Sequence, residues 1–135
     1  MRKAIGAALA AIAAAACAAP VPETQAPPSL AATRWVAADD AKLDRANIPR
    51  LEFSAEGRVI GFTGCNLLNG SYVLEGDRLD VLAATTKRGC MGAPGEAEAK
   101  LLAVLADKPR VKLSARSMLL TGAKGGSVEF RAAPD

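Results

Sequence analysis

The stretch GFTGCNLLNGSY, residues 61 to 72, carries the most specific local signals in the chain. It places Cys65 and Asn66 in a strand-like run that glycines interrupt. Asn69-Gly70 has the residue types of a type I′ turn, because both positions tolerate a positive φ. We therefore expect a hairpin that reverses at Asn69-Gly70. Whether Cys65 is a nucleophile, a metal ligand or half of a disulfide decides whether this stretch does chemistry.

Short strands are indicated on both sides of this stretch. Apolar and polar residues alternate over 51–53, 60–62, 71–74 and 79–81, and turn residues stand at 55–57 and at Gly76-Asp77. Three more strands are predicted over 110–114, 118–121 and 127–131, and the glycine-rich residues 122–126 join the last two. Short strands joined by short turns are typical of an antiparallel meander.

One helix interrupts the strands. Pro94-Gly95-Glu96 has the features of a helix start, and Pro109 marks the end. Ala97, Leu101, Val104 and Leu105 repeat at helical spacing, so one face is apolar and is expected to cover the sheet. The predicted fold is an α+β domain over residues 33–131, with a curled antiparallel sheet of roughly seven or eight short strands capped by one α-helix.

The N-terminus has the pattern of a secretory signal peptide over residues 1–16. Arg2 and Lys3 form a basic start, and residues 4–16 are all Ala, Ile, Leu or Gly. This apolar run is shorter than the roughly 20 residues that a membrane-spanning helix needs. We therefore expect export from the cytoplasm.

Cys17 follows three alanines at the end of this segment, in a setting that resembles a bacterial lipobox. Four prolines then occur between Pro20 and Pro28, which is typical of an extended tether. We expect residues 17–32 to be a lipidated cysteine with a proline-rich tether. The lipid on Cys17 would anchor the protein to the membrane, with the outer membrane favoured because Ala18 follows the cysteine. The alternative is cleavage by ordinary signal peptidase, which gives a soluble periplasmic protein.

With Cys17 used by lipid, Cys65 and Cys90 remain as a pair, and two cysteines in an oxidising compartment most often form a disulfide. Other roles have less support. A redox pair usually has the spacing Cys-x-x-Cys, and a structural zinc site needs four ligands. A catalytic cysteine needs a base, and the chain has no histidine.

Composition argues against several other classes of function. The formal net charge is +3, but removal of Arg2 and Lys3 with the signal would leave +1, so no polyanionic partner is indicated. The few aromatic residues argue against a stacking surface for nucleic acid. The absence of histidine removes the commonest general base and metal ligand. We expect no catalytic residue, no metal and no cofactor.

Several of these residues together resemble the META domain family, also called HslJ-like. The resemblance covers residues 33 to 131 and is most specific in the ordered pair Gly64-Cys65-Asn66 and Thr85-Thr86-x-x-x-Cys90. It is supported by Trp35, by Gly70-Ser71-Tyr72, by a helix that carries Glu98, and by Leu119 and Phe130. The resemblance implies a small bacterial envelope domain, often on lipoproteins, with links in some members to heat shock and antibiotic resistance. It implies no established enzymatic activity.

The motif residues Gly64, Asn66, Gly70, Thr85 and Thr86 have two interpretations, one structural and one as ligand contacts. Asn66 is expected to cap a turn or to satisfy buried backbone, and the threonines to form hydrogen bonds in a loop near Cys90. The whole chain is then predicted to be a non-enzymatic accessory or binding module, related to stress or resistance, that faces the periplasm. Its partner would be an envelope protein or a small ligand. The alternative is a periplasmic binder of a small ligand or peptide, or a protease-inhibitor-like domain.

Overall fold

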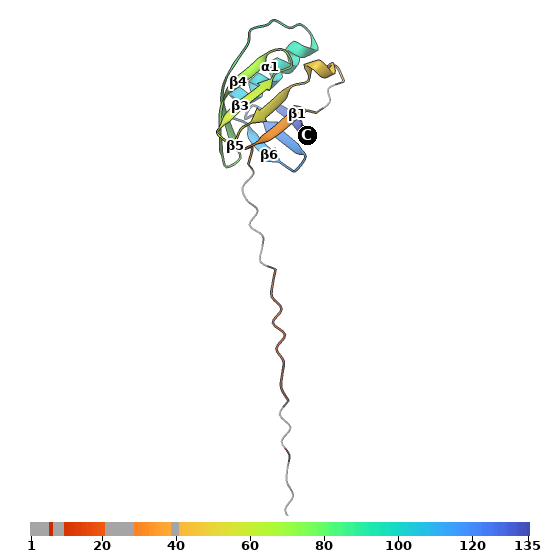
Figure 1. Ribbon diagram of the computed structural model, residues 1–135, viewed down its shortest axis with the longest axis vertical. Helices are drawn as coiled ribbons and strands as arrows, with labels where there is room; N and C mark the ends of the chain where they lie inside the picture. Colours follow the sequence, from red (N-terminus) through yellow and green to blue (C-terminus); the bar gives the residue numbers. More distant parts are fainter. Residues whose placement is uncertain (1–5, 7–9, 21–28, 39–40) are drawn as a thin grey trace, which may run out of the picture.

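The computed structural model describes residues 6, 10–20, 29–38 and 41–135. Within these residues, eight antiparallel strands form a closed barrel (Figure 1). In the same residues, one short 3-10 helix lies between the first and second strands, and one α-helix lies between the fifth and sixth. The elements in chain order are β1 Thr33–Ala37, η1 Arg45–Asn47, β2 Arg50–Phe53, β3 Arg58–Phe62, β4 Leu67–Glu75, β5 Arg78–Thr85, α1 Ala93–Ala106, β6 Arg110–Leu113, β7 Ser117–Thr121 and β8 Ser127–Ala132. The predicted antiparallel sheet with one helix is confirmed. Its closure through pairing of β1 with β8 is more specific than the predicted curled sheet.

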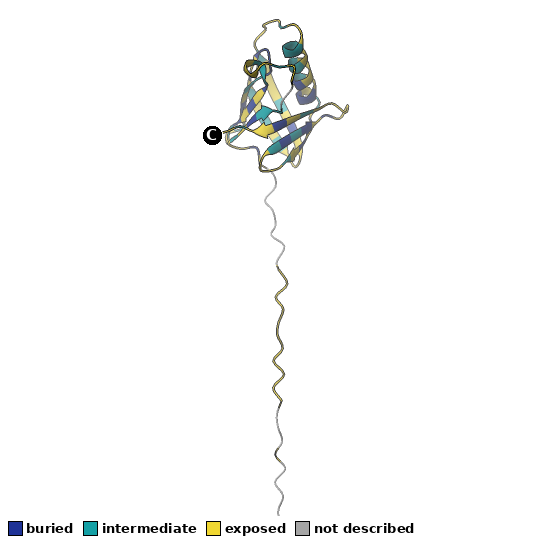
Figure 2. Cartoon of the chain, turned by 90° about the vertical axis from the view of Figure 1, so that its right-hand side faces the viewer, coloured by how far each residue is buried: buried dark blue, intermediate teal, exposed yellow. Residues whose placement is uncertain are grey.

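The interior of the barrel is filled with apolar side chains. Strand residues alternate between the interior and the outer face, as in β2, where Leu51 and Phe53 are buried and Arg50 and Glu52 are exposed (Figure 2). Phe53, Phe130, Leu79, Met118 and Leu120 are completely buried. Alternation therefore gives the barrel a packed core and a largely polar exterior.

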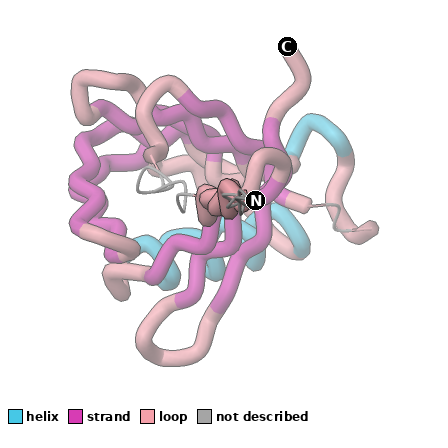
Figure 3. The backbone as a smooth tube through the Cα atoms, turned by 90° about the horizontal axis from the view of Figure 1, so that it is seen from below, coloured by secondary structure: helices cyan, strands magenta, loops and turns pink. Residues whose placement is uncertain are grey.

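Helix α1 closes the barrel where the sheet is least continuous. It connects β5 to β6, and these strands pair at Arg78 and Arg110 alone. The helix packs against β5 and β8 and buries Leu101, Val104 and Leu105, which confirms the predicted apolar face. Seen from below, the strands enclose the interior and α1 lies along one side (Figure 3).

The predicted turn at Asn69-Gly70 is wrong. Both residues lie inside β4, and Gly70 pairs with Val59 on one side and Ala83 on the other. The chain reverses instead at residues 63–66, where the N–H of Thr63 donates to the carbonyl oxygen of Asn66 over 2.8 Å. Gly64 has a φ of +103° in this turn, which favours glycine. The predicted turn at Gly76-Asp77 is confirmed and joins β4 to β5.

The ordered domain begins slightly before the predicted boundary at residue 33. Leu30 is buried in the core, and its carbonyl oxygen accepts a hydrogen bond from the hydroxyl of Thr33. Residues 10–20, including Cys17, are exposed and form no helix or strand. Pro22, Pro27 and Pro28 of the predicted tether, and Arg2 and Lys3 of the predicted signal peptide, lie outside the described residues. None of the helices in the described part has the length and apolar character that a membrane crossing requires.

Candidate functional site

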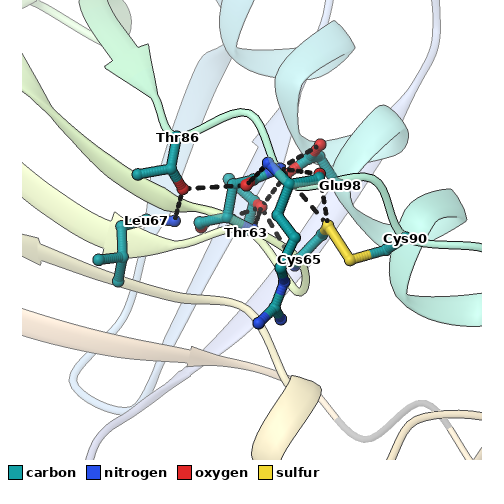
Figure 4. The surroundings of a disulfide bond; sticks show 8 residues. Thr63, Cys65, Leu67, Thr86, Cys90 and Glu98 are labelled. Carbon is teal, nitrogen blue, oxygen red and sulfur yellow. Dashed lines mark hydrogen bonds between the residues drawn. A yellow bond between two sulfur atoms is a disulfide. The ribbon is translucent and has the colours of Figure 1, made fainter.

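Cys65 and Cys90 form a disulfide, as predicted, with their Cα atoms 5.9 Å apart. Cys65 lies in the turn between β3 and β4, and Cys90 lies in the segment between β5 and α1 (Figure 4). The bond therefore fixes the turn to the start of the helix. Because both sulfurs are in the bond, neither is available as a nucleophile in this state, and Cys65 acts as a covalent link.

Asn66 is the centre of a polar cluster beside this disulfide. Its side chain is buried, and its Nδ2 donates to the carbonyl oxygen of Arg88 over 2.9 Å and to the Glu98 carboxylate over 2.9–3.1 Å. Its Oδ1 accepts from the Thr86 hydroxyl over 2.9 Å and from the Arg88 N–H over 2.7 Å. One side chain thus joins the β3–β4 turn, the segment after β5 and helix α1.

Thr63 completes the cluster. Its Oγ1 accepts from the N–H of Asn66 over 2.9 Å and donates to the Glu98 carboxylate. The Thr86 hydroxyl, which donates to Asn66, accepts in turn from the N–H of Leu67 over 3.0 Å. We call Thr63, Asn66, Thr86 and Glu98, with the backbone of Arg88, the Asn66 cluster.

The hydrogen-bonding capacity of Asn66 is fully used inside this cluster. An amide has two donor hydrogens and two acceptor positions, and protein groups occupy all four. No buried side-chain nitrogen or oxygen in the described residues lacks a partner. A ligand could engage the Asn66 amide only by displacing these bonds, so the geometry favours a structural role over ligand contact.

The other residues of the predicted motif lie around the cluster. Thr85 ends β5 and pairs with Leu68, so it is a strand residue and not a loop residue. Gly64 faces helix α1, where an added Cβ would lie 3.2 Å from the Cβ of Ala97. Gly70 lies against the backbone of β5, where an added Cβ would be 2.1 Å from the Leu82 carbonyl oxygen. Both glycines therefore allow close packing between elements.

Sequence reasoning did not assign Thr63 and Glu98 to a site. Glu98 had one usable signal, because it lies three and seven residues before Leu101 and Leu105 and so shares the buried side of the helix with them. A carboxylate on a buried helical stripe needs polar partners. Arg88 takes part in the cluster through its backbone N–H and carbonyl oxygen, so a different side chain at this position should leave these bonds intact.

A second feature is a groove of about 500 Å³ that lies over strands β1 to β4. Its apolar lining includes Ile60, Phe62 and Leu67, and Ile60 and Leu67 are 47% and 63% exposed. Phe62 and Leu67 are paired across β3 and β4, and Ile60 is two residues from Phe62 on the same side of β3. These side chains form a continuous apolar strip on the exterior, which we call the outer strip.

Charged side chains border the outer strip. Arg34, Arg50 and Glu52 line the groove, and the guanidinium of Arg50 lies 5.3 Å from the centre of the Phe62 ring. Arg58 donates a hydrogen bond to Asn69, which also lines the groove. In the described part of the chain, acidic and cysteine side chains do not gather in a group able to hold a metal ion. The groove therefore combines apolar surface with a local excess of positive charge.

The model of the META domain family matches residues 28–135, which include the whole barrel. The chain belongs to the META domain family. Its barrel is similar to the NMR structure of a protein from Burkholderia xenovorans, at 25% identity and a TM-score of 0.63, covering 87% of this chain and 99% of that one. It is also similar to the crystal structure of a DUF4847 family protein from Bacteroides vulgatus, at 13% identity and a TM-score of 0.56, covering 76% and 93%. The second likeness shows the fold alone. No curated protein matches the chain.

Proposed function

We propose that this META domain is a non-enzymatic binding module of the bacterial cell envelope, anchored by a lipid on Cys17 and related to stress or resistance. It would reside on the periplasmic side of the outer membrane and bind an envelope partner through its exterior. The single observation that carries the binding part is the groove over β1 to β4, where apolar side chains are left exposed in a depression.

Three further observations support an anchored domain that acts through its surface. The barrel interior is occupied by its own side chains, including Phe53 and Phe130, so a ligand would compete with the core for that space. The Asn66 cluster uses its polar groups internally, which removes the most polar buried residues as candidates for catalysis. Exposed Cys17 precedes the barrel by a segment that contains prolines, which suits an anchored domain.

The alternative is a soluble periplasmic domain that binds a small ligand or a peptide, or inhibits a protease. The same groove favours this candidate, since its volume lies in the range of small-molecule sites. The two candidates differ in anchoring. They are separated by whether Cys17 carries a lipid.

The anchoring is tested by the intact mass of the protein purified from envelopes, measured before and after reduction with thiol labelling. We expect a chain that starts at Cys17 with a diacyl or triacyl mass increment and no free thiol before reduction. A Cys17→Ser variant serves as the control and should be released in soluble form. An unlipidated wild-type chain in the periplasmic fraction would refute the anchor and favour the alternative.

The binding surface is tested by photo-crosslinking in intact cells. A benzophenone side chain placed at Leu67, in the outer strip, should give a discrete adduct with an envelope component. The same group placed at Lys124, in the exposed β7–β8 loop, is the matched control and should give none. Equal adducts from both positions, or none from Leu67, Ile60 and Phe62, would contradict a binding surface at the groove.

A further inference from the structure

We infer that the groove over β1 to β4 binds an acidic peptide segment, in which carboxylates alternate with apolar side chains. This inference rests on the proposed function and names the chemistry of its partner. It follows from three features of the groove: its apolar strip, the placement of its arginines, and its shape.

The outer strip supplies the apolar half of the site. Ile60 and Leu67 are about half or more exposed, and they lie on adjacent strands next to the ring of Phe62. Covering such side chains with an apolar residue of a partner is favourable, because it removes apolar surface from water. A partner that occupies the groove therefore gains by placing at least one apolar side chain over this strip.

The arginines supply the polar half. Arg34 on β1 and Arg50 on β2 are both exposed and lie on adjacent, paired strands. Arg34 lies opposite Glu52 across β1 and β2 and forms an ion pair with Asp135 at 3.9 Å. Both side chains of this ion pair are more than half exposed, so it contributes little. Among the residues that the structure describes, Glu52 is the single acidic residue that lines the groove. Two guanidinium groups beside an apolar strip match the chemistry of carboxylates spaced along a peptide.

The shape favours a peptide over a membrane surface. The four strands are spaced at about 4.8 Å, so the groove crosses roughly 14 Å of sheet, which four or five extended residues would span. A bilayer cannot enter a depression of about 500 Å³ without deforming.

Binding is tested with the exported, full-length chain carrying Cys17→Ser and a synthetic peptide, acetyl-Asp-Phe-Glu-Leu-Asp-amide. Binding is measured by isothermal titration calorimetry, because the one tryptophan, Trp35, is buried in the core and does not face the outer strip. We expect saturable binding that weakens as salt is raised from about 20 mM to about 300 mM. The uncharged peptide with Asn, Gln and Asn in place of the acids is expected to bind at least about tenfold more weakly.

Three variants assign the effect to the groove. Arg50→Gln should weaken binding of the acidic peptide about tenfold, because it removes one charge-assisted contact. Glu52→Gln should strengthen it, since a carboxylate that would repel the acids of the peptide is removed. Lys112→Gln removes an exposed charge on β6, away from the groove, and should leave affinity unchanged. All three substitutions are at exposed positions, and thermal unfolding of each variant verifies that the barrel is intact.

The outcomes separate the two proposals. Equal binding of the charged and uncharged peptides, or equal effects of Arg50→Gln and Lys112→Gln, would overturn the acidic chemistry. Binding to vesicles of phosphatidylcholine and phosphatidylglycerol that Arg50→Gln abolishes, without peptide binding, would replace the peptide with a membrane surface. If the acidic peptide does not bind while the crosslinker at Leu67 still gives its adduct, the proposed binding module is supported and this inference is wrong. If the peptide does not bind and the crosslinker gives no adduct, both the acidic-peptide inference and the proposed binding surface are wrong.

Discussion

At Asn66, the amide can be exchanged for a carboxylate of the same shape. In Asn66→Asp, the group that donated to Glu98 and to the Arg88 carbonyl becomes an acceptor that faces two acceptors. Burial without donors and repulsion from Glu98 should lower the free energy of unfolding by about 3 kcal/mol or more. Urea denaturation of the variant and the wild type at neutral pH measures this difference in the free energy of unfolding.

The matched control is Asn69→Asp, the same chemical change on the exposed face of β4. Asn69 accepts from Arg58, so the added charge gains a partner and stability should change by less than about 0.5 kcal/mol. Equal stability losses in the two variants would show that the Asn66 cluster has no special importance.

Tyr72 gives the fold a dependence on alkaline pH. Burial raises the pKa of its phenol, and the negative charge of Glu56 raises it further. A phenol whose pKa is higher in the folded than in the unfolded chain contributes stability that is complete below the unfolded pKa of 10.0 and is lost as pH rises through the folded pKa. We therefore expect part of the alkaline loss of stability to come from Tyr72.

The substitution Tyr72→Phe tests whether the phenol causes part of the alkaline loss of stability. The variant should lose about 1 kcal/mol near neutral pH, because the hydroxyl no longer donates to the Ser54 carbonyl oxygen at 2.7 Å. Phe keeps the edge-on contact with Phe53. Above about pH 10 the stability curves of the variant and the wild type should converge. Curves that stay parallel up to alkaline unfolding would refute a role for the phenol.

Among the elements, the contact between β4 and β5 depends on a glycine. An added Cβ at Gly70 would lie 2.1 Å from the Leu82 carbonyl oxygen and 2.5 Å from the Ala83 Cα, both backbone atoms that cannot rotate away. Gly70→Ala should therefore cost about 2 kcal/mol or more, although alanine is otherwise the better strand residue. Gly89→Ala, where a Cβ meets nothing within 4 Å, should be close to neutral in thermal unfolding. A neutral Gly70→Ala would mean that β5 can shift away.

Gly70 also shows what local sequence signals can and cannot predict. Alternation correctly placed the buried residues of β2 and β8, and helical spacing correctly placed Leu101, Val104 and Leu105, because these patterns depend on neighbours in the chain. Asn69-Gly70 satisfied the local rule for a turn, yet the glycine serves a contact with β5. The actual turn at 63–66 is held by Thr86, Arg88 and Glu98, which are distant in sequence.

Of the two candidate sites, one could be predicted from the sequence and the other could not. The disulfide could be predicted, because the expected export and the expected lipidation of Cys17 leave Cys65 and Cys90 as one pair. The groove could not be predicted, because alternation puts Ile60 and Phe62 on one face of the strand but does not indicate whether that face is inside or outside. The inward positions of β3 and β4 are Val59 and Leu68, so the alternation places Ile60, Phe62 and Leu67 on the exterior.

For the whole molecule, the disulfide is expected to contribute a large share of stability. It joins residues 25 positions apart, for which loss of entropy in the unfolded chain corresponds to about 3.5 kcal/mol. The double variant Cys65→Ala, Cys90→Ala should lose about this much in guanidinium denaturation, and wild type in reductant should behave alike. Cys17→Ser, at an exposed cysteine, is the control and should leave the transition unchanged. A loss below about 1 kcal/mol would show that the Asn66 cluster alone holds the turn.

The pairing of the first strand with the last also has a consequence for biosynthesis. Trp35 in β1 lies opposite Ala132 in β8, so the ring cannot close until the segment through Ala132 has been synthesised and can pair with β1. Until then, β1 has one unpaired edge, and the growing meander has another. Contacts this distant in sequence form slowly, and open strand edges attract other chains. A chain that lacks β8 would leave the facing edges of β1 and β7 permanently unpaired.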